Sequence, residues 1–190
     1  MPICFDLKKV KEENNCNIYF ETGLWDVNAE ETSLCKAITM DFDKCASVEM
    51  NEGFVDIAEE KFHNEIADDK LKLFCGRSEG LANYLRLMNL SQDDKILFFL
   101  DSHGSGEGCP LIEELDAIAN LPRNDHVIMI DDVRIIRSCC WSDNRYKGES
   151  FETLLLEKLK EINNDYEIEF LDGYVNNDVL VARVRTPNVD

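Results

Sequence analysis

The sequence predicts an α/β fold, with about seven mostly parallel strands, an antiparallel last strand and helices on both faces of the sheet. Short apolar runs alternate with stretches of helical periodicity along most of the 190 residues. Most runs are continuously apolar, which is typical of parallel strands buried on both faces. The last two runs have no helix between them, so we expect them to pair antiparallel. We expect residues 1–190 to form one domain.

The first half of the chain contains three strand–helix pairs. Each expected strand is a short apolar run, and Gly76 ends the third of them. Each expected helix repeats apolar residues at helical spacing, as Leu81, Leu85 and Met88 do. The expected strands are 17–20, 45–49 and 71–75, and the expected helices are 29–38, 54–66 and 81–88.

The second half contains the remaining strands and two further helices. Pro110 suits the first turn of a helix whose core face is Leu111, Leu115 and Ile118. A polar loop at 137–149 precedes the last helix, and turn residues at 176–178 separate the last two strands. The expected strands are 95–100, 126–130, 166–171 and 179–184, and the last helix is 151–162.

The composition restricts the partners of the chain. The formal net charge is -19, which repels nucleic acid and anionic membranes and favours divalent cations or a cationic ligand. Solubility alone would also account for this charge. The 8 cysteines show no C-x-x-C spacing and only 3 histidines are present, which argues against a structural zinc site. With no signal peptide and no apolar run of membrane length, we expect a cytoplasmic protein.

Acidic residues follow two of the expected strands. Asp101 and His103 come directly after the run at 95–100, and Asp131 and Asp132 come directly after the run at 126–130. In open α/β sheets, ligands bind just beyond the carboxyl ends of the parallel strands. Each aspartate taken alone could equally cap a helix or a loop. Together with the histidine, they predict a functional site at this edge of the sheet.

The order of these residues resembles the class I S-adenosylmethionine-dependent methyltransferases, which have a Rossmann-like fold. The most specific stretch is 99–103 followed by 109–115, which looks like a small subgroup with a Leu-Asp-x-His strand end. The turn after the first strand looks like the cofactor-binding turn of that family, and Glu49 matches the acid that binds the cofactor ribose. The resemblance implies a cofactor site made of Glu21, Gly23, Glu49, Ser78 and Asp101.

The same resemblance implies chemistry on the acceptor side. Asp101, Asp131 and Asp132 are similar in placement to the Mg²⁺ ligands of metal-dependent O-methyltransferases. A metal there would lower the pKa of an acceptor hydroxyl, and His103 is the candidate base. His103 and Asp101 are therefore the expected catalytic residues. The expected acceptor is a small molecule or a glycan, recognised by loops or by the second subunit of a homodimer.

Two other classes of function stay open. Gly23 stands without the further glycines that the family carries in its first turn, and Arg77 replaces an acidic residue. These departures favour a methyltransferase-like binding or scaffold protein without catalytic activity. A metal-dependent hydrolase is also conceivable from Asp101 and His103, but such enzymes need further histidine ligands and none follows His126.

Overall fold

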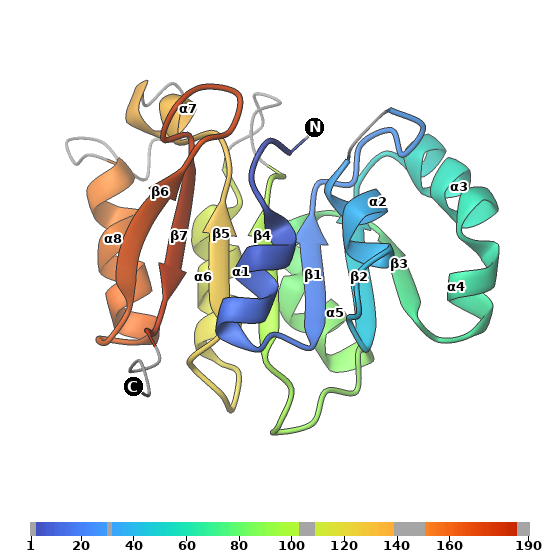
Figure 1. The fold of residues 1–190 in the computed structure, drawn as a ribbon, viewed down its shortest axis with the longest axis horizontal. Coiled ribbons are helices and arrows are strands. Elements are labelled where there is room, and N and C mark those ends of the chain that lie inside the picture. The colour runs from blue at the N-terminus through green and yellow to red at the C-terminus, as the bar shows by residue number, and fades with distance from the viewer. Residues whose placement is uncertain (1–2, 30–31, 103–108, 139–150, 186–190) are drawn as a thin grey trace.

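The computed structural model describes residues 3–29, 32–102, 109–138 and 151–185 (Figure 1). Its centre is a seven-stranded sheet in the order β3-β2-β1-β4-β5-β7-β6. The strands are β1 (Ile18–Thr22), β2 (Lys44–Glu49), β3 (Leu71–Cys75), β4 (Ile96–Leu100), β5 (Val127–Ile130), β6 (Glu167–Leu171) and β7 (Val179–Arg183). The strand β7 is antiparallel to both neighbours, and the pairs among β1 to β5 are parallel. The predicted fold class is confirmed.

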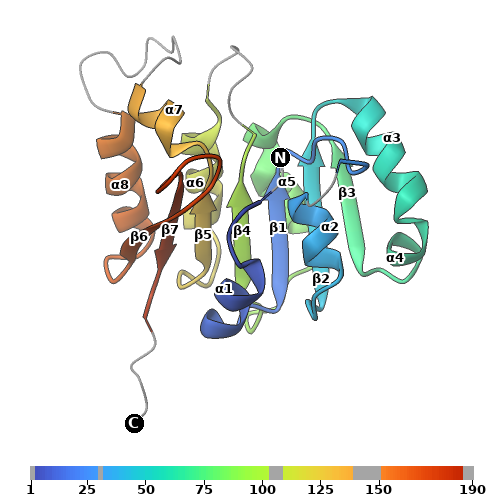
Figure 2. The same ribbon diagram turned by 45° about the horizontal axis from the view of Figure 1, so that its top comes forward.

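Helices cover both faces of the sheet (Figures 1 and 2). One face packs against α1 (Leu7–Asn14), α2 (Ser33–Ile38), α3 (Glu52–Lys61) and α4 (His63–Ala67). The other face packs against α5 (Leu81–Leu87), α6 (Leu111–Ala119), α7 (Val133–Ser138) and α8 (Phe151–Ile162). None of the helices in the described ranges is long and apolar enough to cross a membrane.

The alternation of side chains along β1 separates the two cores. Ile18 and Phe20 pack in the core under α5, α6 and α8, whereas Tyr19 packs in the core under α1 and α2. The two polar residues that continue the strand keep this alternation. Glu21 and Thr22 are both fully buried, on opposite faces of the sheet. A buried polar residue therefore extends into each core at the carboxyl end of β1.

The structure differs from the sequence-based expectations mainly at short elements. The expected helix at 29–38 begins at Ser33, and the expected helix at 54–66 is divided at Phe62 into α3 and α4. Helices α1 and α7 were not expected. Helix α1 presents only two buried apolar residues, Leu7 and Val10, and α7 is too short to show helical periodicity.

The arrangement of strands defines one edge of the sheet as the place for a ligand. Strands β1, β4 and β5 are parallel, so their carboxyl ends meet at the same edge. Between β1 and β4 the strand order reverses, since β2 and β3 lie on one side and β5 on the other. Such a reversal is where open α/β sheets bind ligands.

Candidate functional site at the carboxyl edge of the sheet

Gly23 makes the closest backbone contact at this edge. Its φ is +92°, and a Cβ atom added there would clash with the Asp101 carbonyl oxygen and lie 2.7 Å from its carbon. The Gly23 N–H donates to the Val48 carbonyl at 2.9 Å, and the Asp101 N–H donates to the Thr22 carbonyl at 2.9 Å. Only glycine fits this position without strain. The turn after β1 is thus held tightly against the end of β4.

Glu49 lies at the end of β2, next to that turn. Its carboxylate accepts the N–H of Trp25 at 3.2 Å and the N–H of Asn51 at 2.8 Å. The first bond ties the turn after β1 to the end of β2, and the second shapes the start of α3. Each carboxylate oxygen can accept more than one hydrogen bond, so Glu49 retains capacity for a ligand hydroxyl.

Ser78 begins the short 3-10 helix after β3, at 78–80. Its side chain is buried, and its Oγ lies 2.8 Å from the Oγ of Ser102, which directly follows Asp101. The expected cofactor residue after β3 therefore contacts the loop that follows β4. His103, the expected base in the same loop, lies outside the described residues.

Glu21 occupies the core beneath the edge. It is fully buried and accepts hydrogen bonds from the hydroxyls of Tyr19 at 2.7 Å, Ser33 at 2.5 Å and Ser47 at 2.9 Å. Burial raises the pKa of Glu21, and the three hydroxyls oppose that rise by favouring the charged form. Its described bonds join β1, β2 and the first turn of α2.

Asp101 stands where β4 meets the turn after β1. Burial raises the pKa of Asp101 well above its usual range, and the negative charge of nearby Asp131 raises it further. Two carboxyl groups at the ends of neighbouring strands therefore repel each other. This repulsion is the electrostatic condition under which a bound cation is most favourable.

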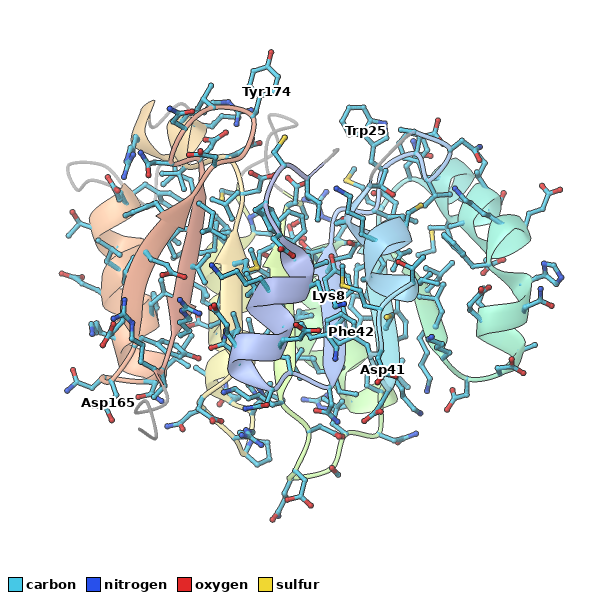
Figure 3. The ribbon with its side chains drawn as sticks, viewed as in Figure 1. Lys8, Trp25, Asp41, Phe42, Asp165 and Tyr174 are labelled. Atoms are coloured by element: carbon cyan, nitrogen blue, oxygen red, sulfur yellow. The ribbon has the colours of Figure 1, made fainter. Side chains whose placement is uncertain are left out.

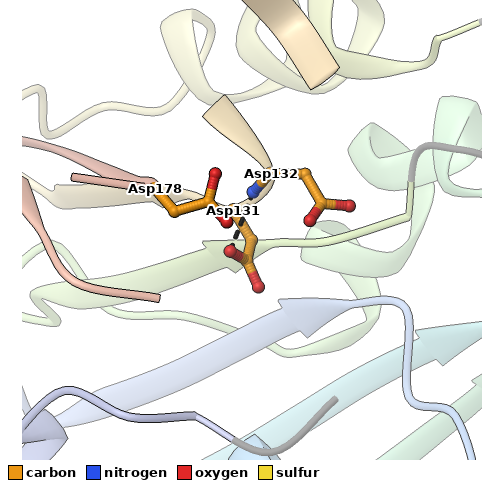
Figure 4. Close-up of side chains that lie close together, drawn as sticks. All are labelled: Asp131, Asp132 and Asp178. Carbon is orange, nitrogen blue, oxygen red and sulfur yellow. Dashed lines mark hydrogen bonds between the residues drawn. The ribbon is translucent and has the colours of Figure 1, made fainter. Parts of the chain in front are cut away.

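The structure brings three aspartates together at the end of β5: Asp131, Asp132 and Asp178 (Figure 4). One carboxylate oxygen from each lies within 4.8 Å of the others, and all three residues are buried. Asp132 has a φ of +59°, and its N–H donates to the Asp131 carboxylate at 2.8 Å. The group found in the described residues thus contains Asp178, where the sequence had suggested Asp101.

Asp178 reaches this group because of the direction of its strand. Strand β7 is antiparallel, so its first residues lie at the edge where the parallel strands end. An acid directly before a final antiparallel strand was therefore a usable sequence signal. The Val133 N–H also donates to the Asp178 carbonyl at 2.9 Å, which fixes the start of α7 against this loop.

Arg134 supplies a positive charge to the aspartate group. Its guanidinium lies 2.6 Å from Asp132 Oδ1 and also pairs with Asp178. The backbone N–H of Arg134 donates to Asp178 Oδ1 at 2.9 Å. Even so, the pKa of Asp131 is raised to about 6, first by burial and then by the charges of Asp132 and Asp178.

The donor set fits a hard divalent cation. Mg²⁺ and related ions prefer carboxylate oxygens and keep several waters, which leaves positions for substrate. Burial is the main cause of the raised pKa of Asp131, and the charges of Asp132 and Asp178 each raise it by more than Arg134 lowers it. Asp131 and Asp132 would hold such an ion, together with Asp178 or Asp101.

Two exposed aromatic side chains project from the same edge of the molecule, Trp25 and Tyr174 (Figure 3). Trp25 is 46% exposed in the turn after β1, and Tyr174 is 78% exposed in the connection between β6 and β7. The Arg134 guanidinium lies 4.9 Å from the Tyr174 ring centroid, a cation–π contact. Aromatic faces at a polar edge suit ring-shaped ligands, including sugars.

No protein-family model and no curated protein sequence matches the chain. Solved structures do match it. An O-methyltransferase of Bacillus cereus in complex with S-adenosylhomocysteine is 13% identical, with a TM-score of 0.61 and coverage of 94% of this chain and 78% of that one. A Podospora anserina methyltransferase bound to the same compound is 16% identical, with a TM-score of 0.55 and coverage of 94% and 76%.

A third similar structure is the O-methyltransferase TomG of Streptomyces achromogenes, which takes part in tomaymycin synthesis and was solved with S-adenosylmethionine. It is 12% identical, with a TM-score of 0.56 and coverage of 94% of this chain and 77% of that one. Likeness at such identities concerns the fold. The chain therefore has the fold of the class I S-adenosylmethionine-dependent O-methyltransferases.

Proposed function

We propose that the protein is a methyltransferase that moves the methyl group of S-adenosylmethionine to a hydroxyl oxygen of a small molecule or glycan, assisted by a divalent cation. One observation carries the proposal. In a methyltransferase-type sheet, the glycine turn after β1 and the acid after β2 lie at the same edge as the aspartates that follow β4 and β5. The edge thus combines a donor side and an acceptor side.

The donor side consists of the residues around the strand reversal. Gly23 lets the turn after β1 lie tightly against the end of β4, and Glu49 would bind the ribose hydroxyls. Ser78 would border the adenine, and Asp101 would close the pocket on the β4 side. Glu21 contributes indirectly, since its buried hydrogen bonds hold β1, β2 and α2 together.

The acceptor side consists of the aspartates and the expected base. A bound cation would lower the pKa of the acceptor hydroxyl and orient it. His103 takes the hydroxyl proton, and the oxygen forms a bond to the sulfonium methyl carbon as the carbon–sulfur bond breaks. The products are the methyl ether, S-adenosylhomocysteine and a protonated histidine, which returns its proton to water. Asp131 and Asp132 carry the cation in this scheme.

A binding protein without catalytic activity is the second candidate. Both oxygens of Glu49 already accept backbone N–H groups, from Trp25 and Asn51. The turn after β1 also continues from Gly23 into the bulky residues 24–25 instead of further glycines. A binding protein of this kind would bind the nucleoside part of a ligand at the donor side and would not position a methyl acceptor.

Ligand-dependent stability and calorimetry test the proposal. A ligand at about 100 times its Kd should raise Tm by roughly 5 to 10 °C for a chain of this size. Titration with S-adenosylhomocysteine should show binding that Glu49→Gln weakens about tenfold, because one acceptor becomes a donor. Glu52→Gln, which changes a neighbouring exposed acid at the start of α3, is the matched control.

The metal part has its own variant. Asp132→Asn keeps the positive φ accessible, since asparagine tolerates this conformation, but removes one charge from the aspartate group. Magnesium should raise the Tm of the wild-type protein and leave that of the variant unchanged. Absence of binding at millimolar S-adenosylmethionine would contradict the methyltransferase proposal as a whole. Binding of the cofactor without any magnesium effect would remove only the cation.

A further inference from the structure

A second buried acid, Glu114, contacts the loops that carry the candidate cofactor site. It belongs to α6 and is fully buried among the apolar residues Leu111, Leu115 and Ile118. Its Oε1 accepts the Ser102 hydroxyl at 2.7 Å, and the Ser102 oxygen lies 2.8 Å from the Ser78 hydroxyl. One carboxyl group of α6 therefore connects, through hydroxyls, to the loops that follow β4 and β3.

The same carboxyl group also faces β1. Burial raises the pKa of Glu114, and the bond from the Ser102 hydroxyl opposes that rise. Glu114 Oε2 and Thr22 Oγ1 are both buried and make no hydrogen bond within the described parts of the chain. Thr22 ends β1, directly before Gly23. The hydroxyls around this carboxyl group thus come from the ends of three strands that border the strand reversal.

A carboxyl group at this position is unfavourable for stability alone. A buried polar group without full hydrogen bonding destabilises the folded protein, and an apolar side chain of similar size is often neutral or stabilising in its place. The neighbours of Glu114 on the same face of α6 are apolar, and a leucine would continue that face. The acid therefore calls for an explanation other than packing.

We propose that Glu114 is a positioning residue for the candidate cofactor site, which fixes the loops that follow β3 and β4 relative to one another through Ser102 and Ser78. The inference rests on the proposed function, since it concerns the same site. The backbone of Ser102 directly follows Asp101 and lies beside Gly23, and its side chain contacts Ser78. Without these hydrogen bonds the two loops would be less ordered. The cofactor would then have to order them on binding, which lowers its affinity.

Replacement of Glu114 tests the role, because affinity and stability should move differently. Glu114→Leu removes the connection and the buried acid together. We expect an unchanged or higher Tm without ligand, and an affinity for S-adenosylhomocysteine reduced by about tenfold or more. Glu114→Gln should restore the affinity, since its amide offers an acceptor to Ser102 and a donor to Thr22.

Ser102→Ala provides an independent route to the same result. It should reproduce most of the loss of affinity, and the double variant with Glu114→Leu should lose little more, because both changes cut one connection. The matched control is Asp116→Asn, which alters an exposed acid of the same helix, paired with Lys158, and should leave affinity unchanged.

The outcomes are distinguishable. If the wild-type protein does not bind S-adenosylhomocysteine, the proposed function fails and this inference fails with it. If the wild-type protein binds and Glu114→Leu binds equally well, only the positioning role is overturned. A loss of affinity in Glu114→Leu that Glu114→Gln does not restore, or additive losses in the double variant, would also overturn it. If Glu114→Leu does not fold, Ser102→Ala and Glu114→Gln decide alone.

Discussion

The charge on Asp131 should make the stability of the protein depend on pH in a defined way. Asp131 is buried at the end of β5, and its pKa is raised from 3.8 to about 6 by burial and by the charges of Asp132 and Asp178. Asp131→Asn removes this ionisation while it keeps a side-chain oxygen to accept the Asp132 N–H. In metal-free buffer, the variant should therefore become more stable than the wild-type protein as pH rises.

The magnitude follows from the two pKa values. A raised pKa stabilises the folded protein fully below the unfolded pKa, near 4, and this stabilisation is lost as pH rises to about 6. At about 1.4 kcal/mol for each tenfold change in the acidity constant, the loss is on the order of 3 kcal/mol. The unfolding free energy of Asp131→Asn relative to wild type should rise by that amount between about pH 4 and pH 7.

The assay is urea unfolding of both proteins over this pH range in the presence of EDTA. The wild-type curve alone is not informative, because His126 has its pKa lowered from 6.5 to about 4 by burial. A lowered histidine pKa stabilises the folded state above pH 6.5, and that stabilisation is lost as pH falls towards 4. The two residues oppose each other over one range, and the difference between variant and wild type cancels His126.

A difference in stability that stays constant with pH would refute this reasoning, because the carboxyl group would then be equally acidic in the folded and unfolded chains. Magnesium adds a second comparison. At about pH 7, saturating magnesium should stabilise the wild-type protein and largely abolish the advantage of Asp131→Asn. An advantage unaffected by magnesium would keep the repulsion but remove the cation site.

Three further predictions concern single residues. In chemical denaturation, Gly23→Ala should destabilise the protein by about 2–4 kcal/mol, because the added Cβ would meet the Asp101 backbone at positive φ. The control Gly53→Ala in α3 should change stability by less than about 1 kcal/mol. By the same measurement, Arg134→Ala should lower the free energy of unfolding by about 3 kcal/mol, because it leaves the buried Asp178 without its guanidinium partner. Arg137→Ala breaks a more exposed pair with Glu152 and should lower it by less than about 1 kcal/mol. An NMR titration of the His126 ring should give a midpoint near 4, and a midpoint near the ordinary 6.5 would show that the ring is not buried.

The fold was predictable because its signals are local. Continuous apolar runs such as 96–100 and 127–130 identify buried parallel strands, and the absence of a helix between the last two runs identifies the antiparallel pair. The end of β1 at Glu21 and Thr22 was harder to predict, since two polar residues after an apolar run are typical of the start of a loop. They are strand residues because Glu21 finds three hydroxyl partners inside the core.

The site was predictable only where it depends on single strand ends. Asp131 and Asp132 follow β5 directly, so their position needed no knowledge of strand order. Asp178 needed, besides the antiparallel pair of last strands that the sequence predicts, the pairing of β7 with β5, which is non-local. Glu114 did leave a local signal, since it lies three residues after Leu111 and four before Ile118, on the apolar face of α6. An acid on such a face predicts a buried carboxyl group.

The net charge of the aspartate group indicates whether Arg134 replaces a metal ion or only fixes Asp178 beside one. Its three carboxylates and the one guanidinium of Arg134 leave a net charge of about −2 when all are ionised, which matches a divalent cation. If Arg134 were a replacement for a metal, it would suppress the repulsion among the acids. It pairs with Asp132 and Asp178, yet beside the larger effect of burial the charges of these two acids each raise the pKa of Asp131 by more than Arg134 lowers it. Arg134 is therefore better understood as the partner that fixes Asp178 in place, and the remaining charge at Asp131 as what a cation would neutralise.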